Sequence, residues 1–311
     1  MDFEYLFELL CGGVVKGSIY ALIALGYTMV YGIIQLINFA HGEVLMVGAL
    51  VAWTVIGLLQ VVVPGMPTWL ILLAATIAGC AVAALLNIVI EKIAYRPLRN
   101  APRLAPLITA IGMSILLQAL AMVIWKPNVK SFPSMLPTDP YFIGEAVITP
   151  TQIMILVVTV MSLAVLMYIV HYTRIGRAMR ATAENPRVAA LMGVKPDAVI
   201  SATFAIGAVL AAIAGVMYAS NYGTAQHFMG FLPGLKAFTA AVFGGIGNLA
   251  GAVVGGVLLG LIEAIGSGYL GTLTGGLLGS HYADIFAFIV LIIVLTLRPS
   301  GLLGERVADR A

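Results

Sequence analysis

Long apolar runs separated by short polar connections dominate the chain. About 20 consecutive apolar residues are needed for a helix to cross a bilayer. Candidate stretches lie at residues 5–34, 43–63, 69–90, 104–125, 148–170, 198–220, 248–268 and 282–298. Backbone polar groups must satisfy one another in lipid, and the short alternating segments of a β-barrel are absent. The pattern therefore predicts about eight membrane-spanning helices.

Composition supports this prediction. Of the 311 residues, 61% are apolar and only 9% are charged, whereas a soluble domain carries about 25% charged residues. A water-soluble globule of this length could not bury so much apolar surface. The sequence predicts an all-α, polytopic membrane protein of about eight to ten helices, with residues 1–311 as a single transmembrane domain. Soluble enzymes and disordered proteins are excluded, and a net charge of +3 gives no indication of a nucleic-acid partner.

Basic residues gather in two connections, which predicts the orientation. Residues 91–103 contain four Lys or Arg residues and residues 171–197 contain five. Such loops remain in the cytoplasm, so the intervening loop 126–147 is predicted to lie outside. Eight full spans would also leave the carboxyl-terminal tail outside, although its basic residues favour the cytoplasm: Arg298, Arg306 and Arg310. Either a segment within 234–268 re-enters or crosses once more, which we expect near 234–247, or the tail is an exception.

The first polar interruption is the run from Asn38 to Glu43, Asn-Phe-Ala-His-Gly-Glu, which also contains His41. Polar groups at bilayer depth are costly unless they face a cavity, a partner or the interface. Gly42 permits a break, Asn38 is suited to cap a new helix, and Glu43 complements the positive end of that helix. A broken helix that lines a cavity is one interpretation, and a short wet turn at the cytoplasmic surface is the other. The local sequence leaves the two equal.

Glycines recur at four-residue intervals within residues 244–260. Gly247, Gly251 and Gly255 would lie on one helix face, where close helix packing is favoured over a direct role with substrate. Polar residues nearby are better candidates for a pathway: Lys236, Thr239, Asn248 and Glu263. Because Glu263 lies deep in an apolar run, we expect it to be paired or to face water.

The basic connection at 171–197 contains a short predicted helix. Asn185 is suited to the N-cap, Pro186 to the first helical position, and Gly193 to the carboxyl-terminal stop. The turns between them present apolar residues on one side: Val188, Leu191 and Met192. A helix this short needs a surface to pack on. That surface is either another protein or the lipid interface.

Signatures of catalysis are absent from the sequence. It contains no Gly-Lys dipeptide, so it cannot form a phosphate-binding P-loop. The four histidines are isolated from one another, and no Gly-x-Ser-x-Gly nucleophile elbow occurs. We therefore expect a non-catalytic protein with no cofactor and no metal.

Several runs carry a family resemblance, at residues 18–34, 37–43, 91–99, 109–114, 176–193, 236–247 and 298–304. They closely resemble the LivH-type permeases of bacterial branched-chain amino acid ABC importers. The resemblance spans nearly the whole chain and is weakest in the loop 126–147. It implies a multi-pass permease subunit in the bacterial inner membrane. A LivM-like second permease, two cytoplasmic ATP-binding subunits and a periplasmic amino-acid-binding protein would be its partners, besides membrane lipid.

The resemblance also implies a role for the loop helix. Residues 187–193 are similar to a degenerate Glu-Ala-Ala…Gly coupling motif, with Arg187 where the motif has Glu. The loop would then dock on an ATPase subunit through Arg177, Arg180, Glu184, Asn185, Pro186, Arg187, Val188, Leu191, Met192 and Gly193. The translocation pathway is predicted at Asn38, His41 and Glu43, with Ser114, Gln118, Thr239 and Glu263 as further members.

Two other functions stay open on the sequence. One is a permease of the same family for another small solute, such as urea, amides or aromatic amino acids. The other is an ion-coupled secondary transporter, in which Glu43, Glu263 and Asp284 would be the ion sites.

Overall fold

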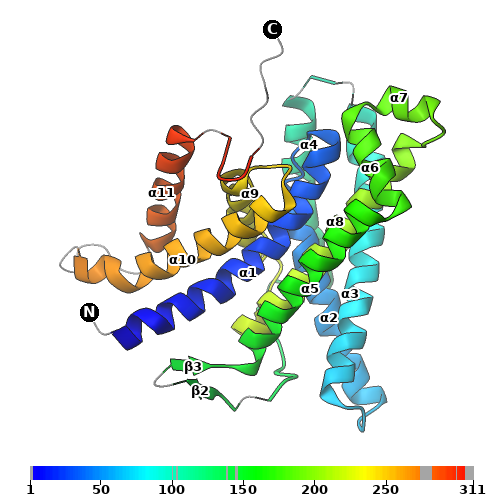
Figure 1. Cartoon of the computed structure of the whole chain (residues 1–311). Coiled ribbons are helices and arrows are strands. Elements are labelled where there is room, and N and C mark those ends of the chain that lie inside the picture. Colours follow the sequence, from blue (N-terminus) through cyan, green and yellow to red (C-terminus); the bar gives the residue numbers. More distant parts are fainter. Residues whose placement is uncertain are drawn as a thin grey trace.

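The computed structural model describes residues 3–99, 101–102, 104–137, 139–143, 146–273, 282–298 and 300–304, and most of them are helical (Figure 1). The long helices are α1 (Phe3–Ile34), α2 (His41–Val62), α3 (Thr68–Ile90), α4 (Leu104–Trp125), α5 (Pro150–Tyr172), α8 (Pro196–Tyr222) and α10 (Leu249–Leu273). The shorter helices are α6 (Arg174–Glu184), α7 (Pro186–Leu191), α9 (Phe231–Gly244) and α11 (Ala283–Leu297). A π-helical turn (η1, Glu91–Tyr95) and a 3-10 turn (η2, Arg96–Leu98) continue α3. Four short strands are β1 (Lys130–Ser131), β2 (Tyr141–Ile143), β3 (Ala146–Ile148) and β4 (Thr224–Ala225).

The described helices confirm a polytopic all-α membrane protein, with shorter apolar helices beside the long ones. Within the described ranges, seven helices are long and apolar enough to cross a membrane. They correspond to the first seven predicted stretches. The eighth stretch, 282–298, forms α11, which has only 15 residues. At 1.5 Å per residue this helix covers about 22 Å, less than the hydrocarbon core of about 30 Å.

The core lies around α1, α2 and α8. These helices contribute many of the fully buried side chains, among them Leu22, Leu45 and Phe204. Helix α10 crosses α1 closely because Gly256 and Gly260 pack against the backbone of α1. Helices α3, α4 and α5 instead expose apolar side chains on their outer faces: Ile77, Val123 and Val160. Such faces are suited to lipid or to another membrane protein.

The position of the carboxyl-terminal tail follows from its contacts with α9, the helix that precedes α10. Leu302 N and Leu303 N each donate a 2.9 Å hydrogen bond to the last carbonyls of α9. Beyond α9, Gly247 and Leu249 line a small cavity together with Met179 of α6. The described tail, residues 300–304, therefore lies at the end of the bundle that carries α6 and α7 (Figure 1). This arrangement supports an additional segment within 234–268, and α9 is that segment; Arg306 and Arg310 lie outside the described residues.

The two basic connections lie at one end of the bundle, as their charge pattern predicts. Arg96 and Arg99, which follow α3, both pair with Asp197 at the start of α8. The β2–β3 hairpin lies at the opposite end (Figure 1). There β1 pairs with β4, so the loop 126–137 is joined to the segment that follows α8. Arg103 and Glu145 lie outside the described residues.

Candidate functional site

A non-helical segment, residues 35–40, separates α1 from α2, and its polar residue Asn38 is buried. Asn38, His41 and Glu43 are 2%, 0% and 1% exposed, so the interpretation of this run as a wet surface turn is wrong. The break precedes Gly42, because Gln35 has a φ of 52°. Ala40, rather than Asn38, occupies the N-cap position of α2. The chain thus turns back into the bundle, and α2 starts inside it.

The start of α2 lies deeper in the bundle than the end of α1. The His41 ring packs so closely on Gly26 that any side chain at position 26 would overlap the imidazole. The same ring lies 4.7 Å from the ring of Tyr27. Gly26 precedes the end of α1 at Ile34 by eight residues, which is about 12 Å along a helix. The amino terminus of α2 therefore lies within the membrane-spanning region.

The first turns of α2 and α9 meet in backbone contact. Gly42 is the second residue of α2, and Gly230 is the N-cap residue of α9. A Cβ atom on either glycine would overlap the carbonyl oxygen of the other. Gly234, one turn into α9, also packs against the backbone of Gly42. Two interrupted helices therefore begin at the same depth.

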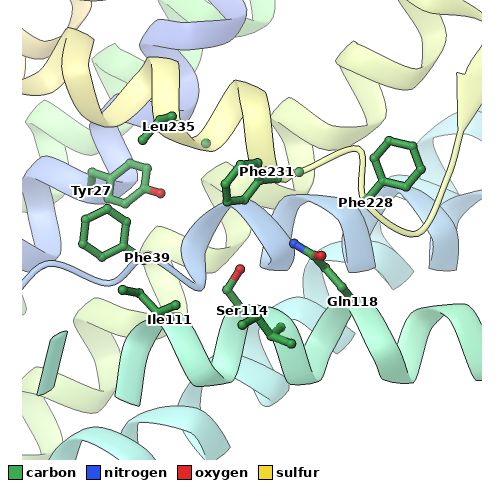
Figure 2. A pocket seen from close by; sticks show the side chains of 11 residues that line it. Tyr27, Phe39, Ile111, Ser114, Gln118, Phe228, Phe231 and Leu235 are labelled. Atoms are coloured by element: carbon green, nitrogen blue, oxygen red, sulfur yellow. The ribbon is translucent and has the colours of Figure 1, made fainter. Parts of the chain in front are cut away.

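A cavity of about 550 Å³ lies beside these two helix starts (Figure 2). This volume is in the range of small-ligand pockets. Its wall is mainly aromatic and aliphatic: Tyr27, Phe39, Ile111, Ile115, Phe228, Phe231 and Leu235. Besides the hydroxyl group of Tyr27, the polar side chains of the wall are Ser114 and Gln118. Both point from α4 toward the start of α2 (Figure 2). The cavity thus combines an apolar wall with a small polar region.

Glu43 lies directly behind that polar region. Its Oε1 accepts hydrogen bonds from Ser114 Oγ (3.1 Å) and Gln118 Nε2 (2.7 Å). Its Oε2 is buried and has no hydrogen-bond partner within the described chain. A buried carboxylate oxygen without a partner is costly in apolar surroundings. The structure thus brings three predicted pathway residues together: Ser114 and Gln118 line the cavity, and Glu43 lies behind them without lining it.

Asn38 and His41 have other surroundings. Asn38 Oδ1 accepts hydrogen bonds from Tyr95 Oη (2.8 Å) and Ala40 N (3.1 Å). Its amide donates to Asn87 Oδ1, and Asn87 in turn donates to the Phe204 carbonyl (2.7 Å). Neither Asn38 nor His41 lines the cavity. Asn38 instead ties the non-helical segment to α3 and α8, which holds the start of α2 in place.

Glu263, which is buried, belongs to a second polar cluster formed by α1, α9, α10 and α11. Its Oε2 accepts a hydrogen bond from Tyr20 Oη (2.9 Å) and pairs with Lys236 Nζ (3.2 Å). Lys16 Nζ lies 3.7 Å from Oε1. Lys236 also binds Asp284 Oδ1 at 2.7 Å. Glu263 is therefore paired, as its position in an apolar run predicts.

Thr239 is likewise separate from the cavity. Its hydroxyl donates to the Lys236 carbonyl one turn earlier in α9 (2.7 Å), and neither Thr239 nor Glu263 lines the cavity wall. Of the predicted pathway set, only Ser114 and Gln118 line the cavity, and only Glu263 belongs to the charged cluster that joins four helices. Glu43 is bonded to the two lining residues.

The glycines of α10 pack as close helix neighbours, with one exception. Cβ atoms on Gly251 and Gly255 would overlap the backbone of Gly244 and Ala240 in α9. Gly247 instead lies in the turn before α10 with a φ of 99°, and the space where its Cβ would project is empty. The prediction that Gly247 packs on a helix face is therefore wrong. Its backbone conformation, which side chains disfavour, accounts for the glycine.

The short helix in the basic loop forms as predicted. Asn185 Oδ1 accepts from Arg187 N (3.0 Å) and Val188 N (3.2 Å), and Gly193 has a φ of 84° just after the helix. The apolar side chains near its end are Leu191 and Met192, which are 87% and 81% exposed. The remaining loop residues are also exposed: Arg177, Arg180, Glu184 and Pro186.

Helix α6 anchors this loop in the bundle. Thr173 ends α5 and caps α6, because its hydroxyl accepts from Gly176 N (3.1 Å). Met179 is buried in a cluster with Met29 of α1, Leu166 of α5 and Val199 of α8. Helix α6 therefore joins α7 to three long helices, α1, α5 and α8.

The sequence analysis missed several buried polar residues, among them Asn87 and Glu91. Asn87 is fully buried in α3, and its signal was an isolated amide in an apolar run. Glu91 is also fully buried, bound to Ser201 Oγ (2.7 Å) and to Arg99. Its position in a basic loop gave no indication of burial.

These features define a class of protein: a polytopic helical permease, in which interrupted helices meet beside a ligand-sized cavity within the membrane-spanning region. A family model described as "Branched-chain amino acid transport system / permease component" matches residues 9–295. The chain belongs to this family and is a multi-pass protein of the inner membrane.

Individual relatives agree with the family match. The high-affinity branched-chain amino acid transport system permease protein LivH of Escherichia coli (strain K12) is 44% identical over 310 residues, covering 98% of this chain and 97% of LivH. The corresponding protein BraD of Pseudomonas aeruginosa is 46% identical over 309 residues, covering 97% of both chains. The fructose import permease protein FruG of Bifidobacterium longum is 28% identical over 226 residues, covering 71% of this chain and 65% of FruG. No solved structure matches the chain.

Proposed function

We propose that the chain is the permease subunit of an ATP-driven importer that moves branched-chain, hydrophobic amino acids across the bacterial inner membrane. Relatives named for this transport match it over nearly its whole length. The observation that carries the proposal is the exposed apolar end of α7, Leu191 and Met192, at the basic end of the bundle. The sequence itself has no P-loop, so the energy of ATP must enter through a partner.

The proposed partners are a LivM-like second permease, two cytoplasmic ATP-binding subunits and a periplasmic amino-acid-binding protein. The exposed apolar faces of α4 and α5 support a neighbour in the membrane. The exposed end of α7 supports a neighbour in the cytoplasm, because apolar side chains in water favour burial in an interface. In this proposal residues 171–197 form the cytoplasmic coupling loop of a single transmembrane domain.

Coupling would proceed through the contacts of α6. Closure of the ATPase subunits moves α7, and α6 passes that displacement to α1, α5 and α8 through the buried Met179. Packed helices shift as units rather than deforming continuously. The start of α2 and the short helix α9 lie against α1, so their contact at Gly42 and Gly230 is placed to respond.

The proposed pathway passes the cavity at Ser114 and Gln118, which hold the Glu43 carboxylate behind the wall. Its aromatic and aliphatic wall is compatible with a branched side chain, and its few polar groups with weak, reversible binding. Asn38 and His41 would hold the start of α2, while Glu263 and Thr239 would set the position of α9.

Reconstitution of the whole importer in proteoliposomes tests the proposal. We expect uptake of radiolabelled leucine that requires enclosed ATP and the external binding protein and that persists with an uncoupler. Uptake without ATP that collapses with an uncoupler would instead establish an ion-coupled transporter. Calorimetric titration of the cognate binding protein with leucine, urea, acetamide and phenylalanine tests the substrate. Preference for a solute other than leucine, isoleucine or valine would overturn the assignment.

A further inference from the structure

A cleft of about 750 Å³ lies between the end of α3 and the start of α8, at the basic end of the bundle. One side carries Lys92 and Arg96, from the turns that continue α3. The other side carries Lys195, the N-cap residue of α8, together with Asp197. The cleft is separate from the cavity beside α2 and α9, because the two share no lining residue. The proposed pathway and the coupling contacts leave it unused.

The cleft carries an excess of two positive charges. Asp197 is already neutralised, since its Oδ2 binds Arg96 and its Oδ1 binds Arg99 Nη1 (2.6 Å). Arg99 also pairs with the buried Glu91, so these two arginines and two acids balance one another. Within the described ranges, neither of the two lining lysines forms an ion pair. Both lysines are exposed, and their ammonium groups are therefore available to an anion.

An exposed apolar face of α3 leads directly to Lys92. Helix α3 lies at the edge of the bundle (Figure 1), and Leu85, two turns before Lys92 on the same face, is 65% exposed. Ile88, one turn before Lys92, lines the cleft itself. Four helical residues cover about 6 Å, and the polar layer on each side of a bilayer is about 5–8 Å thick. With Ile88 at the edge of the hydrocarbon, Lys92 reaches the level of the lipid phosphate groups.

We propose that this cleft binds the headgroup of an anionic phospholipid, with its phosphate on Lys92 and Lys195 and its acyl chains along the exposed face of α3. Ammonium groups donate charge-assisted hydrogen bonds to phosphate oxygens, and basic pockets between membrane helices favour acidic headgroups. A zwitterionic phospholipid carries an ammonium group of its own, which would face the two lysines. The excess charge of the cleft therefore selects for a lipid with net negative charge.

The surroundings of the cleft favour a lipid over a soluble anion or an acidic protein surface. Ile93, next to Lys92 in the chain, is 72% exposed, and Leu85 is nearly as open. A soluble anion would neutralise the lysines and leave these apolar side chains uncovered. A phospholipid covers both kinds of surface with a single molecule, because its phosphate and its acyl chains are joined through one glycerol.

Native mass spectrometry of the full-length permease in mild detergent counts bound lipids directly. The delipidated protein is titrated with dioleoylphosphatidylglycerol and, separately, with dioleoylphosphatidylethanolamine, which has the same acyl chains. We expect the first phosphatidylglycerol molecule to bind about tenfold or more tightly than phosphatidylethanolamine. Glycerol 3-phosphate, which has the phosphate but no acyl chains, should not displace it at about a hundredfold excess. Displacement would identify a soluble phosphate compound as the ligand and would overturn the lipid assignment, as would equal affinities for the two lipids.

The double variant Lys92→Gln with Lys195→Gln tests the position of the site. It should weaken phosphatidylglycerol binding by about tenfold, to the level of phosphatidylethanolamine, and leave phosphatidylethanolamine binding unchanged. Arg174→Gln with Arg298→Gln removes two exposed cations outside the cleft and should leave both affinities at the parent values. An equal loss in the two double variants, or no loss in the lysine variant, would overturn the site. If the permease purified with its ATPase subunits bound no phosphatidylglycerol while the isolated chain did, a protein partner would be the occupant instead.

Discussion

The ammonium group of Lys236 on α9 lies 2.7 Å from the carboxylate of Asp284 on α11. The same ammonium group lies 3.2 Å from Glu263 on α10, which also accepts a hydrogen bond from Tyr20 on α1. One lysine thus joins α9 to two neighbouring helices inside an apolar bundle. Helix α9 is too short to span a bilayer, so the thickness of the bilayer does not fix its position. These polar contacts fix it instead.

Lys236→Met should therefore destabilise the protein. The change keeps the length of the side chain but leaves Glu263 and Asp284 with one nearby cation, Lys16. Breaking a buried ion pair costs about 3–5 kcal/mol, and we expect about 1–3 kcal/mol here because the Asp284 side chain is 40% exposed. Thermal unfolding followed by fluorescence-detected size exclusion should show an apparent Tm lower by about 5 °C.

A second substitution tests whether charge imbalance is the cause. Adding Asp284→Asn to Lys236→Met leaves Lys16 and Glu263 as a balanced pair, so the double variant should recover much of the lost stability. Lys126→Met, in the loop at the opposite end, is the matched control and should leave the Tm unchanged, because this lysine is exposed. A double variant as unstable as Lys236→Met alone would contradict the electrostatic explanation.

The contact between Gly42 and Gly230 gives a steric prediction. Gly230 has a φ of −81°, which any residue adopts, so Gly230→Ala introduces no backbone strain. Its new methyl group would, however, overlap the Gly42 carbonyl and separate the starts of α2 and α9. We expect ATP-driven leucine uptake to fall by about tenfold or more, because misplacement of a site by about 1 Å costs on that order.

Gly57→Ala provides the control for that experiment. Gly57 lies farther along α2 with open space around the position of its Cβ. Alanine there should stabilise the helix by up to about 1 kcal/mol and leave uptake intact. If Gly230→Ala transported as well as Gly57→Ala, the close approach of the two helix starts would have no role in transport.

Local sequence signals were sufficient for the long helices and for α7. The apolar runs predicted the seven long helices. Asn185 and Gly193 predicted the two ends of α7, because helix capping depends on residues that are adjacent in the sequence. Its exposed apolar side chains were likewise predictable, since a two-turn helix has no room to bury them.

Non-local contacts decided what the sequence left open. The residues from Asn38 to Glu43 are equally compatible with a solvent-exposed turn and with a buried break between two helices. Only the contacts of Asn38 with Asn87 and Tyr95, which lie far along the chain, distinguish the two. The partners of Glu263 are equally distant, because Lys16 and Tyr20 come from the first helix. The sequence pattern therefore could not predict that the cavity and the charged cluster are separate sites.

Leu191→Asp tests the docking of α7 on a partner. Leu191 is 87% exposed, so the change should leave the stability of the isolated permease unaltered. A charge in an apolar interface is costly, so uptake should fall by about tenfold or more while ATP hydrolysis continues, or the ATPase subunits should dissociate during purification. Leu191→Met keeps an apolar side chain and should retain coupling. Unchanged uptake by Leu191→Asp, with the ATPase subunits still bound, would refute docking through this helix.

Asn185→Ala tests whether α7 must be folded to act. The Asn185 side chain accepts hydrogen bonds from two backbone N–H groups at the start of α7. Loss of such a cap costs about 1 kcal/mol, which a six-residue helix cannot recover elsewhere. Local opening should therefore become about fivefold more frequent, and trypsin cleavage after the exposed Arg187 should accelerate by the same factor.

The same digest contains its own control, because Arg177 lies in α6, which Thr173 caps independently. Cleavage after Arg177 should not change. Asn185→Asp retains an accepting oxygen at the cap and should restore both slow cleavage after Arg187 and leucine uptake. If Asn185→Ala accelerated cleavage but left uptake at the parent level, α7 would act as a flexible tether rather than as a rigid coupling helix. A parallel loss of uptake and of protection from trypsin, both recovered by aspartate, would tie coupling to the folded helix itself.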